Sequence, residues 1–156
     1  MRTDPDHPGS EGHYLLVRSG GYRCAVPVEA AKLVTRAPRV YPLPSSEPRL
    51  LGLATIAGEP VAVVDLHALL DPEGEPGGGH ELTVIVRRPG GGSSLGLAVD
   101  DAFGVITVVD RQDRVTDDPG WVAGRSTMDD RTIIILDPER LFVAADSVEE
   151  GAFDAG

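Results

Sequence analysis

Four histidines, one cysteine and three pairs of adjacent aspartates are the residues with which this chain could do chemistry. No two of the histidines (His7, His13, His67 and His80) have the H-x-x-x-H or H-E-x-x-H spacing that places two zinc ligands on one helix face. Cys24 alternates with apolar neighbours in a predicted strand, which is typical of a small buried hydrophobic side chain. These residues therefore predict structural or surface roles.

The aspartate pairs are Asp100-Asp101, Asp117-Asp118 and Asp129-Asp130. Clustered carboxylates can bind a hard cation, but none of the three pairs has the D-x-D-x-D-G spacing of a calcium loop, and turns favour aspartate for other reasons. Gly90-Gly91-Gly92 lacks the Lys and Ser/Thr that complete a phosphate-binding loop. We expect no catalytic residue, metal or cofactor, and a metal-binding barrel is the weakest of the alternatives.

The charge balance points away from nucleic acid. The 156 residues carry 14 basic and 25 acidic side chains, a formal net charge of −11, whereas phosphate binding requires clustered Lys and Arg. A single cysteine allows no internal disulfide, and no run of about 18 apolar residues could span a membrane. Residues 1–12 are polar and lack the apolar core of a signal peptide. These features predict a cytoplasmic protein without membrane insertion.

The elements that would position these residues are mostly short strands separated by glycine-rich turns, a pattern typical of β-barrels and sandwiches. The apolar segment Leu50–Leu66 is the clearest hairpin, with two strands separated by Ala57-Gly58-Glu59-Pro60. One turn of helix and then a strand are expected over Val28–Arg36. The other predicted strands are His13–Arg18, Tyr22–Val26, Glu81–Arg87, Leu95–Val99, Ala102–Val109, Trp121–Met128 and Thr132–Leu136.

Two short helices are predicted, each preceded by an aspartate that can accept hydrogen bonds from the first backbone N–H groups. One runs from Leu66 to Leu70 after Asp65, and the other follows Asp137, with Pro138 at its first position. The glycine-rich stretch near residue 75 is the best internal boundary. The predicted organisation is a disordered tail (1–12), a single domain (13–148) with a first barrel (13–70), a linker (71–80), a second barrel (81–136) and a C-terminal helix (138–148), and an acidic tail (149–156).

Five segments, in order along the chain, resemble motifs of the CheW-like domain family, the scaffold adaptors of bacterial chemosensory arrays. The resemblance covers about residues 13–145, and any one segment alone is weak. The segments are Cys24–Ala30, Leu43-Pro44 followed by Leu50-Leu51-Gly52, Gly58–Leu66, Gly96–Ala102, and Gly124 followed by Ile133–Asp137.

The resemblance implies a mainly β fold of two packed five-stranded SH3-like barrels with short helices and no active site. It implies two partners, the cytoplasmic tip of a chemoreceptor and a histidine kinase of the chemosensory type. The function it implies is a non-enzymatic scaffold that couples the two. The positions that match the family and shape the fold are Gly52, Gly58, Asp65, Gly96 and Asp100.

The chain departs from the family at positions that help to engage partners. Thr55 and Ala57 stand where the family hairpin usually carries Asn and Arg, and Leu33 stands where it often has Glu. Arginine is commonly an interface hot spot, so its loss predicts an altered partner-binding surface at Leu33, Thr55, Ala57 and Gly58. The alternative is a degenerate family member that self-associates, or that serves another assembly related to motility or pili.

Overall fold

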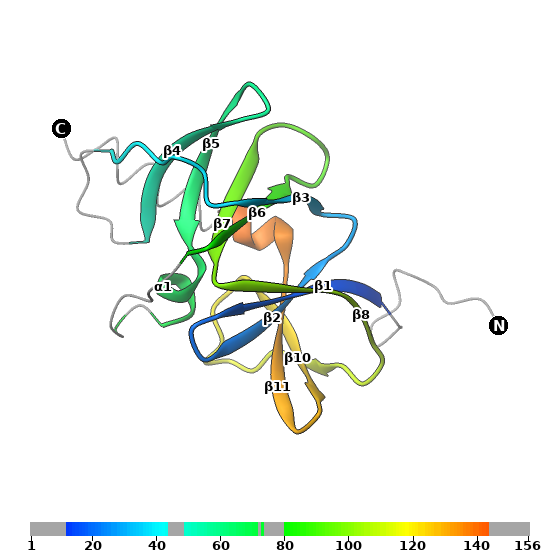
Figure 1. The fold of residues 1–156 in the computed structure, drawn as a ribbon. Helices are drawn as coiled ribbons and strands as arrows, with labels where there is room; N and C mark the ends of the chain where they lie inside the picture. The colour runs from blue at the N-terminus through cyan, green and yellow to red at the C-terminus, as the bar shows by residue number, and fades with distance from the viewer. Residues whose placement is uncertain (1–11, 44–48, 72, 74–79, 144–156) are drawn as a thin grey trace.

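The computed structural model describes residues 12–43, 49–71, 73 and 80–143, which form two antiparallel-rich sheets (Figure 1). The six-stranded sheet has the order β8-β1-β2-β11-β10-β9, and the five-stranded sheet has the order β3-β6-β7-β5-β4. The strands of the first sheet are β1 (Gly12–Ser19), β2 (Tyr22–Pro27), β8 (Asp101–Val108), β9 (Gln112–Asp113), β10 (Val122–Met128) and β11 (Arg131–Leu136). Those of the second are β3 (Ala31–Arg36), β4 (Leu50–Ile56), β5 (Glu59–Asp65), β6 (Leu82–Arg87) and β7 (Ser94–Val99).

The predicted mainly β fold is confirmed, but the division of the strands between a first barrel (13–70) and a second (81–136) is wrong. Each sheet takes strands from both sides of residues 71–80, because β1 and β2 pair with β8 and β11, while β5 pairs with β7. Turn sequences predict only the pairing of strands that are neighbours in the chain. The pairs β2–β11 and β5–β7 are parallel and long-range, and a hairpin turn cannot connect parallel strands. The sixth strand, β9, lies between the predicted strands Ala102–Val109 and Trp121–Met128, where the sequence pattern predicts no strand.

The β4–β5 hairpin turns on two residues, Ala57 and Gly58, because Ile56 pairs with Glu59. Glu59 and Pro60 already belong to β5, so the turn is shorter than the predicted four-residue separation. Both turn residues have positive φ, 52° for Ala57 and 81° for Gly58. Positive φ is typical of two-residue hairpin turns, because the backbone twist of such turns matches the right-handed twist of the flanking strands.

Both predicted helix starts are capped as expected. The Asp65 carboxylate accepts hydrogen bonds from the His67 and Ala68 N–H groups at the start of α1 (Leu66–Leu70). Asp137 accepts from Glu139 N–H, at 3.1 Å, at the start of the helix over residues 138–143. The rest of the predicted C-terminal helix, 144–148, lies outside the described residues, as do residues 1–11 and 149–156 of the predicted tails. Gly12, assigned to the first tail, is instead the first residue of β1. None of the described helices is long and apolar enough to cross a membrane.

The main core lies between the two sheets. Leu15, Val17 and Val26 of the six-stranded sheet pack with Leu95 and Leu97 of the five-stranded sheet in one buried cluster. Leu141 and Phe142 of the C-terminal helix join the same cluster, as does Cys24. Cys24 is fully buried, as predicted for a small hydrophobic side chain, and burial raises the pKa of its thiol from 9.0 to about 12. The sheets are therefore joined by a shared apolar layer as well as by the chain itself.

Candidate partner-binding surface

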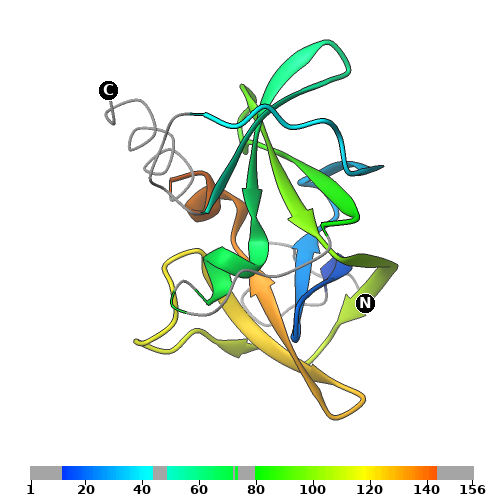
Figure 2. The same ribbon diagram turned by 60° about the vertical axis from the view of Figure 1, so that its left-hand side comes forward.

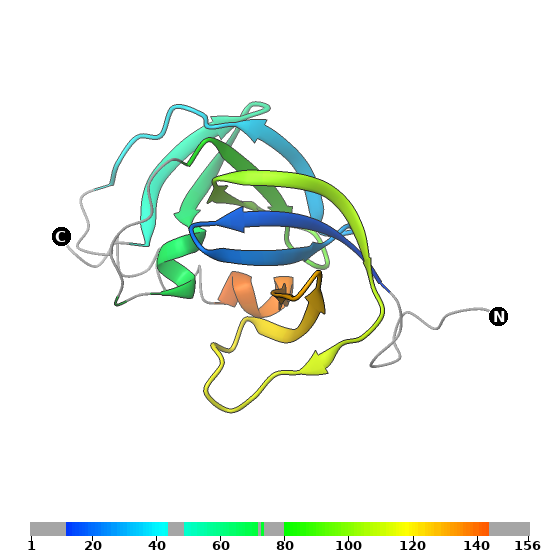
Figure 3. The same ribbon diagram turned by 60° about the horizontal axis from the view of Figure 1, so that its bottom comes forward.

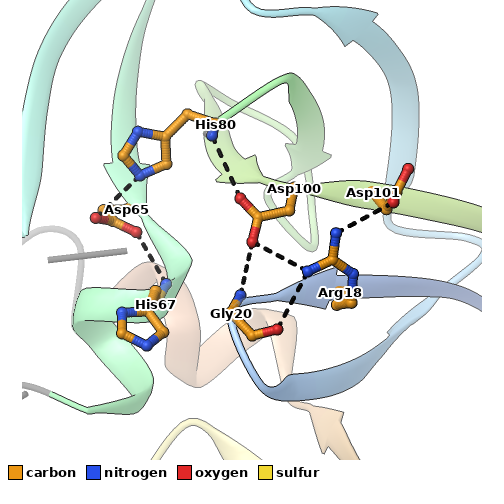
Figure 4. A network of polar contacts seen from close by, with 7 residues as sticks. All are labelled: Arg18, Gly20, Asp65, His67, His80, Asp100 and Asp101. Atoms are coloured by element: carbon orange, nitrogen blue, oxygen red, sulfur yellow. Dashed lines mark hydrogen bonds and ion pairs between the residues drawn. The ribbon is translucent and has the colours of Figure 1, made fainter. Parts of the chain in front are cut away.

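Asp100 stands at the junction between the two sheets, at the end of β7 (Figure 4). Its Oδ2 accepts a hydrogen bond from Gly20 N–H at 2.7 Å and lies 3.5 Å from an Arg18 guanidinium nitrogen. Its Oδ1 accepts from His80 N–H at 3.3 Å. One carboxylate therefore holds the β1–β2 turn against the chain that leads into β6, which is a structural role for a predicted fold-defining residue.

Asp65 makes a second junction next to the first. One of its oxygens caps α1, with His67 N–H at 2.9 Å, and the other lies 3.1 Å from Nε2 of His80. The His80 contact has ion-pair distance but not hydrogen-bond geometry. Because His80 contacts Asp65 through its ring and Asp100 through its backbone, the two aspartates form one network. Sequence reasoning placed Asp65 at the helix start but missed its contact with His80.

Gly52, another predicted fold-defining residue, has φ of +145° and no room for a side chain. A Cβ there would overlap the backbone carbonyl of Tyr41. Tyr41 and Leu53 exchange two backbone hydrogen bonds, of 2.8 and 3.0 Å, so the segment after β3 returns to the edge of β4. Gly96 is also confined, since a Cβ would lie 3.1 Å from a Thr83 methyl carbon. Both glycines let backbone or side chains approach closely.

The residues predicted to bind partners are all exposed, but they do not lie together. Thr55, Ala57 and Gly58 occupy the tip of the β4–β5 hairpin, which projects at the opposite end of the molecule from the β10–β11 hairpin (Figure 2). Leu33, which is 43% exposed, lies on β3 at the other edge of the five-stranded sheet. Leu33 and Thr55 also face opposite sides of this sheet. Cross-strand pairing puts Leu33 on the same face as Gly96 and Gly52, whereas Thr55, three residues after Gly52, is on the other face.

Sequence reasoning missed a set of exposed apolar side chains. Phe103 is 47% exposed and Val105 is 64% exposed, both on β8, an edge strand next to β1 (Figure 3). Val28 and Val34 are each 38% exposed near β3. The run from Ala102 to Val109 predicts a strand, but it gives no sign that this strand lies at an edge, so exposure could not be foreseen.

No arrangement in the described residues suggests catalysis at the polar network. Asp65, His80 and Asp100 lie close together, but no group of three or more His, Cys, Asp or Glu residues in the described ranges could hold a metal ion. The network's oxygens are used by backbone N–H groups at a helix start and a turn. Its chemistry is that of a structural clasp between sheets.

Comparison with known proteins identifies the family. The CheW-like domain profile matches residues 13–146, and no curated protein sequence matched. Among solved structures, the scaffolding protein TtCheW from Thermoanaerobacter tengcongensis is similar, with 22% identity over 84% of this chain and 92% of that chain. Its TM-score of 0.70 shows that the fold is shared. The family match spans both sheets and the network between them, and the chain therefore belongs to the CheW-like domain family.

Proposed function

We propose that this chain is a non-enzymatic scaffold that couples chemoreceptor tips to a histidine kinase in a chemosensory array, with an altered choice of partners. The observation that carries the proposal is the family match over residues 13–146. Such a role places the protein in the cytoplasm, where receptor tips and kinase meet. The partners are protein surfaces, consistent with exposed side chains at the edges of both sheets.

The altered choice rests on the tip of the β4–β5 hairpin. Thr55 and Ala57 are exposed, and space around Gly58 is open because no atom lies within 4 Å of a Cβ built there. A side chain longer than that of Ala57 would therefore extend into solvent without displacing the fold. Asn and Arg at these positions would restore a charged, hydrogen-bonding tip, and arginine is enriched among interface residues that dominate affinity.

The test is a comparison of affinities for a chemosensory kinase domain and a receptor-tip fragment. The double variant Thr55→Asn/Ala57→Arg should bind an ordinary array kinase or receptor tip at least about tenfold more tightly than the unchanged chain, equivalent to about 1.4 kcal/mol. Isothermal titration calorimetry measures this directly. An unchanged affinity for both partners would show that these positions do not set partner choice.

The β10–β11 hairpin supplies a matched control. Asp129 and Asp130 turn it, both with positive φ, and Thr127 has the same exposed place before the turn that Thr55 has in β4. Thr127→Asn/Asp129→Arg therefore introduces the same two side chains at the opposite end of the molecule. It should leave both affinities within about twofold, which separates a local effect of the hairpin from a general effect of added positive charge.

The self-association alternative loses part of its basis. An apolar surface for self-association that joined the substituted positions would include both Leu33 and Ala57, but these residues lie at opposite edges of the five-stranded sheet. A single contact between two copies cannot use both residues of one protomer as one continuous patch. Light scattering over a concentration series remains the measurement that distinguishes a stable dimer from a scaffold of other proteins.

A further inference from the structure

Three arginines gather on one face of the six-stranded sheet. Arg18 of β1 and Arg23 of β2 are direct cross-strand partners, and Arg23 is in register with Ile133 of β11. Arg131 begins β11 two residues before Ile133, about 7 Å along the strand. Because side chains two residues apart share a face, and cross-strand partners do too, all three guanidinium groups leave the same side of the sheet.

Two of these arginines have no acidic partner in the part of the chain that the structure describes. Arg18 lies 3.5 Å from Asp100 and 3.2 Å from Asp101. Arg23 and Arg131 form no ion pair and no side-chain hydrogen bond with any residue that the structure describes, and the Nε of Arg23 is buried without an acceptor. The chain has 25 acidic and only 14 basic residues, so this lack of pairing does not come from a shortage of carboxylates.

An aromatic ring holds one of the two unpaired guanidinium groups. The Cζ of Arg23 lies 4.9 Å from the ring centroid of Phe103, within the range of a cation–π contact. Phe103 reaches this position from β8, two strands away, where the register with β1 shifts and Gly104 has φ of +96°. The ring is still 47% exposed. The contact orients Arg23 and leaves apolar surface for a partner next to a positive charge.

A cavity of about 360 Å³ opens at the same end of the sheet. Its lining includes Arg23 and Arg131, together with Tyr22, Thr132, Ile134 and Arg125, whose guanidinium is paired with Asp118. The parallel strands β2 and β11 both begin here, so their first residues surround the opening. Arg23 and Arg131 border this cavity from the face that carries the three guanidinium groups, whereas Tyr22, Thr132 and Ile134 alternate with them along β2 and β11 and reach it from the other face of the sheet.

We infer that Arg23, Arg131 and Phe103 form a docking site for an acidic segment of a protein partner. Guanidinium groups bind carboxylates with two parallel hydrogen bonds, and the site presents two that have no acceptor in the described structure. The direct pairing of Arg18 with Arg23 places like charges opposite one another, and Asp100 and Asp101 lie beside Arg18 and not beside Arg23, so an anion at Arg23 would reduce the remaining repulsion. The inference does not rest on the proposed coupling function, because this surface lies far from the β4–β5 hairpin tip.

The probe is hexaglutamate, titrated into the full chain at low salt, with hexaglutamine as the uncharged comparison. NMR resonances of the arginine Nε–H groups report which side chains respond. Saturable shifts are expected at Arg23 and Arg131 with hexaglutamate and not with hexaglutamine, and raising the salt to about 0.2 M should weaken the binding. Arg131→Gln should weaken it about tenfold, and Phe103→Leu about threefold, because the guanidinium of Arg23 is then less well oriented.

The matched control is Arg36→Gln. Arg36 is exposed at the end of β3, so this variant removes one positive charge from the other sheet. It should bind hexaglutamate within about twofold of the unchanged chain. The inference is overturned if hexaglutamate causes no saturable shift at Arg23 and Arg131, or if Arg36→Gln weakens binding as much as Arg131→Gln. Circular dichroism of each variant checks that a lost affinity does not reflect unfolding.

Discussion

Neighbouring aspartates in this chain have unequal roles, and the difference comes from where each carboxylate points. Asp100 accepts two backbone hydrogen bonds and its side chain is 16% exposed, whereas the side chain of Asp101 is 52% exposed and contacts Arg18 alone among the described residues. Removing a partly buried carboxylate leaves its backbone donors without an acceptor. The free-energy cost of those unsatisfied donors exceeds the contribution of a surface ion pair. The doublet in the sequence does not reveal which member has the structural role.

Asp100→Ala should lower the free energy of unfolding by about 2 kcal/mol, because the Gly20 and His80 N–H groups lose their acceptor. Asp101→Ala is the matched control, with an expected change below about 0.5 kcal/mol. Urea denaturation of the two variants measures both values. Equal effects at the two positions would contradict the role assigned to Asp100.

Burial of Cys24 predicts how stability changes in alkali. The unfolded thiol ionises above pH 9.0, whereas the folded thiol keeps its proton until its pKa of about 12. The unfolded state therefore loses a proton that the folded state keeps, and between these values stability should fall by about 1.4 kcal/mol per pH unit. Below pH 9 this group contributes no pH dependence.

The measurement is urea denaturation at several pH values from 8 to 11, for the unchanged chain and for Cys24→Ala. Other groups titrate in this range in both proteins, so the difference between their slopes isolates the thiol. The slope should be shallower in Cys24→Ala, even though loss of the buried sulfur lowers its stability near pH 8, where the thiol is protonated in both states. Parallel slopes would mean that the thiol ionises as readily in the folded protein as in the unfolded chain.

At the level of single elements, turns and helix caps follow local sequence rules closely. Asp65 and Asp137 cap helices as predicted, and the β4–β5 hairpin forms where its apolar strands and glycine indicate. Its turn is nevertheless imperfect, because Ala57 has φ of 52°, a conformation that places Cβ of an L-residue too close to the following carbonyl. This strain is tolerated because the strands on both sides of the turn are well paired.

Ala57→Gly should therefore raise the free energy of unfolding by about 1 kcal/mol, because glycine adopts positive φ without this clash. Gly58→Ala, at the second turn position with φ of 81°, should lower it by a similar amount. Thermal unfolding followed by circular dichroism measures both. A decrease in stability for Ala57→Gly would show that the gain in the turn is outweighed by the greater freedom of the unfolded chain.

The pairing of elements was much less accessible from sequence than the elements themselves. Strand positions follow from apolar alternation, but the parallel pairs β2–β11 and β5–β7 join residues that are far apart in the chain. The same limit applies to the candidate site. Thr55 and Ala57 could be placed on one hairpin, but the distance of Leu33 from them depends on sheet order, and the Arg23–Phe103 contact depends on three adjacent strands.

The whole molecule is held together by contacts between the part of the chain before residues 71–80 and the part after them. Both sheets contain strands from each side of that segment, the main core lies between the sheets, and the Asp65–His80–Asp100 network joins them at one end. Neither half of the chain can complete a sheet without the other. This arrangement explains why one family profile spans residues 13–146 as a single unit.

Expressed alone, residues 1–70 and 81–156 should each lack cooperative unfolding, because β1 and β2 lose β8 and β11, and β5 loses β7. Mixing the two fragments should restore a cooperative transition if they assemble. The intact chain, by comparison, should unfold in a single transition seen alike by circular dichroism and by Trp121 fluorescence, since Trp121 is buried in the main core. An independently folded fragment would contradict the shared architecture.

The proposed scaffold must hold two partners at once, and sedimentation velocity of purified components tests this most directly. A chemosensory kinase domain and a receptor-tip fragment are run together, with and without this chain, at concentrations on the order of tens of micromolar. A faster-sedimenting species that contains all three proteins, and that forms only when this chain is present, is the expected result. If kinase and receptor sediment identically with and without the chain, the coupling function is wrong.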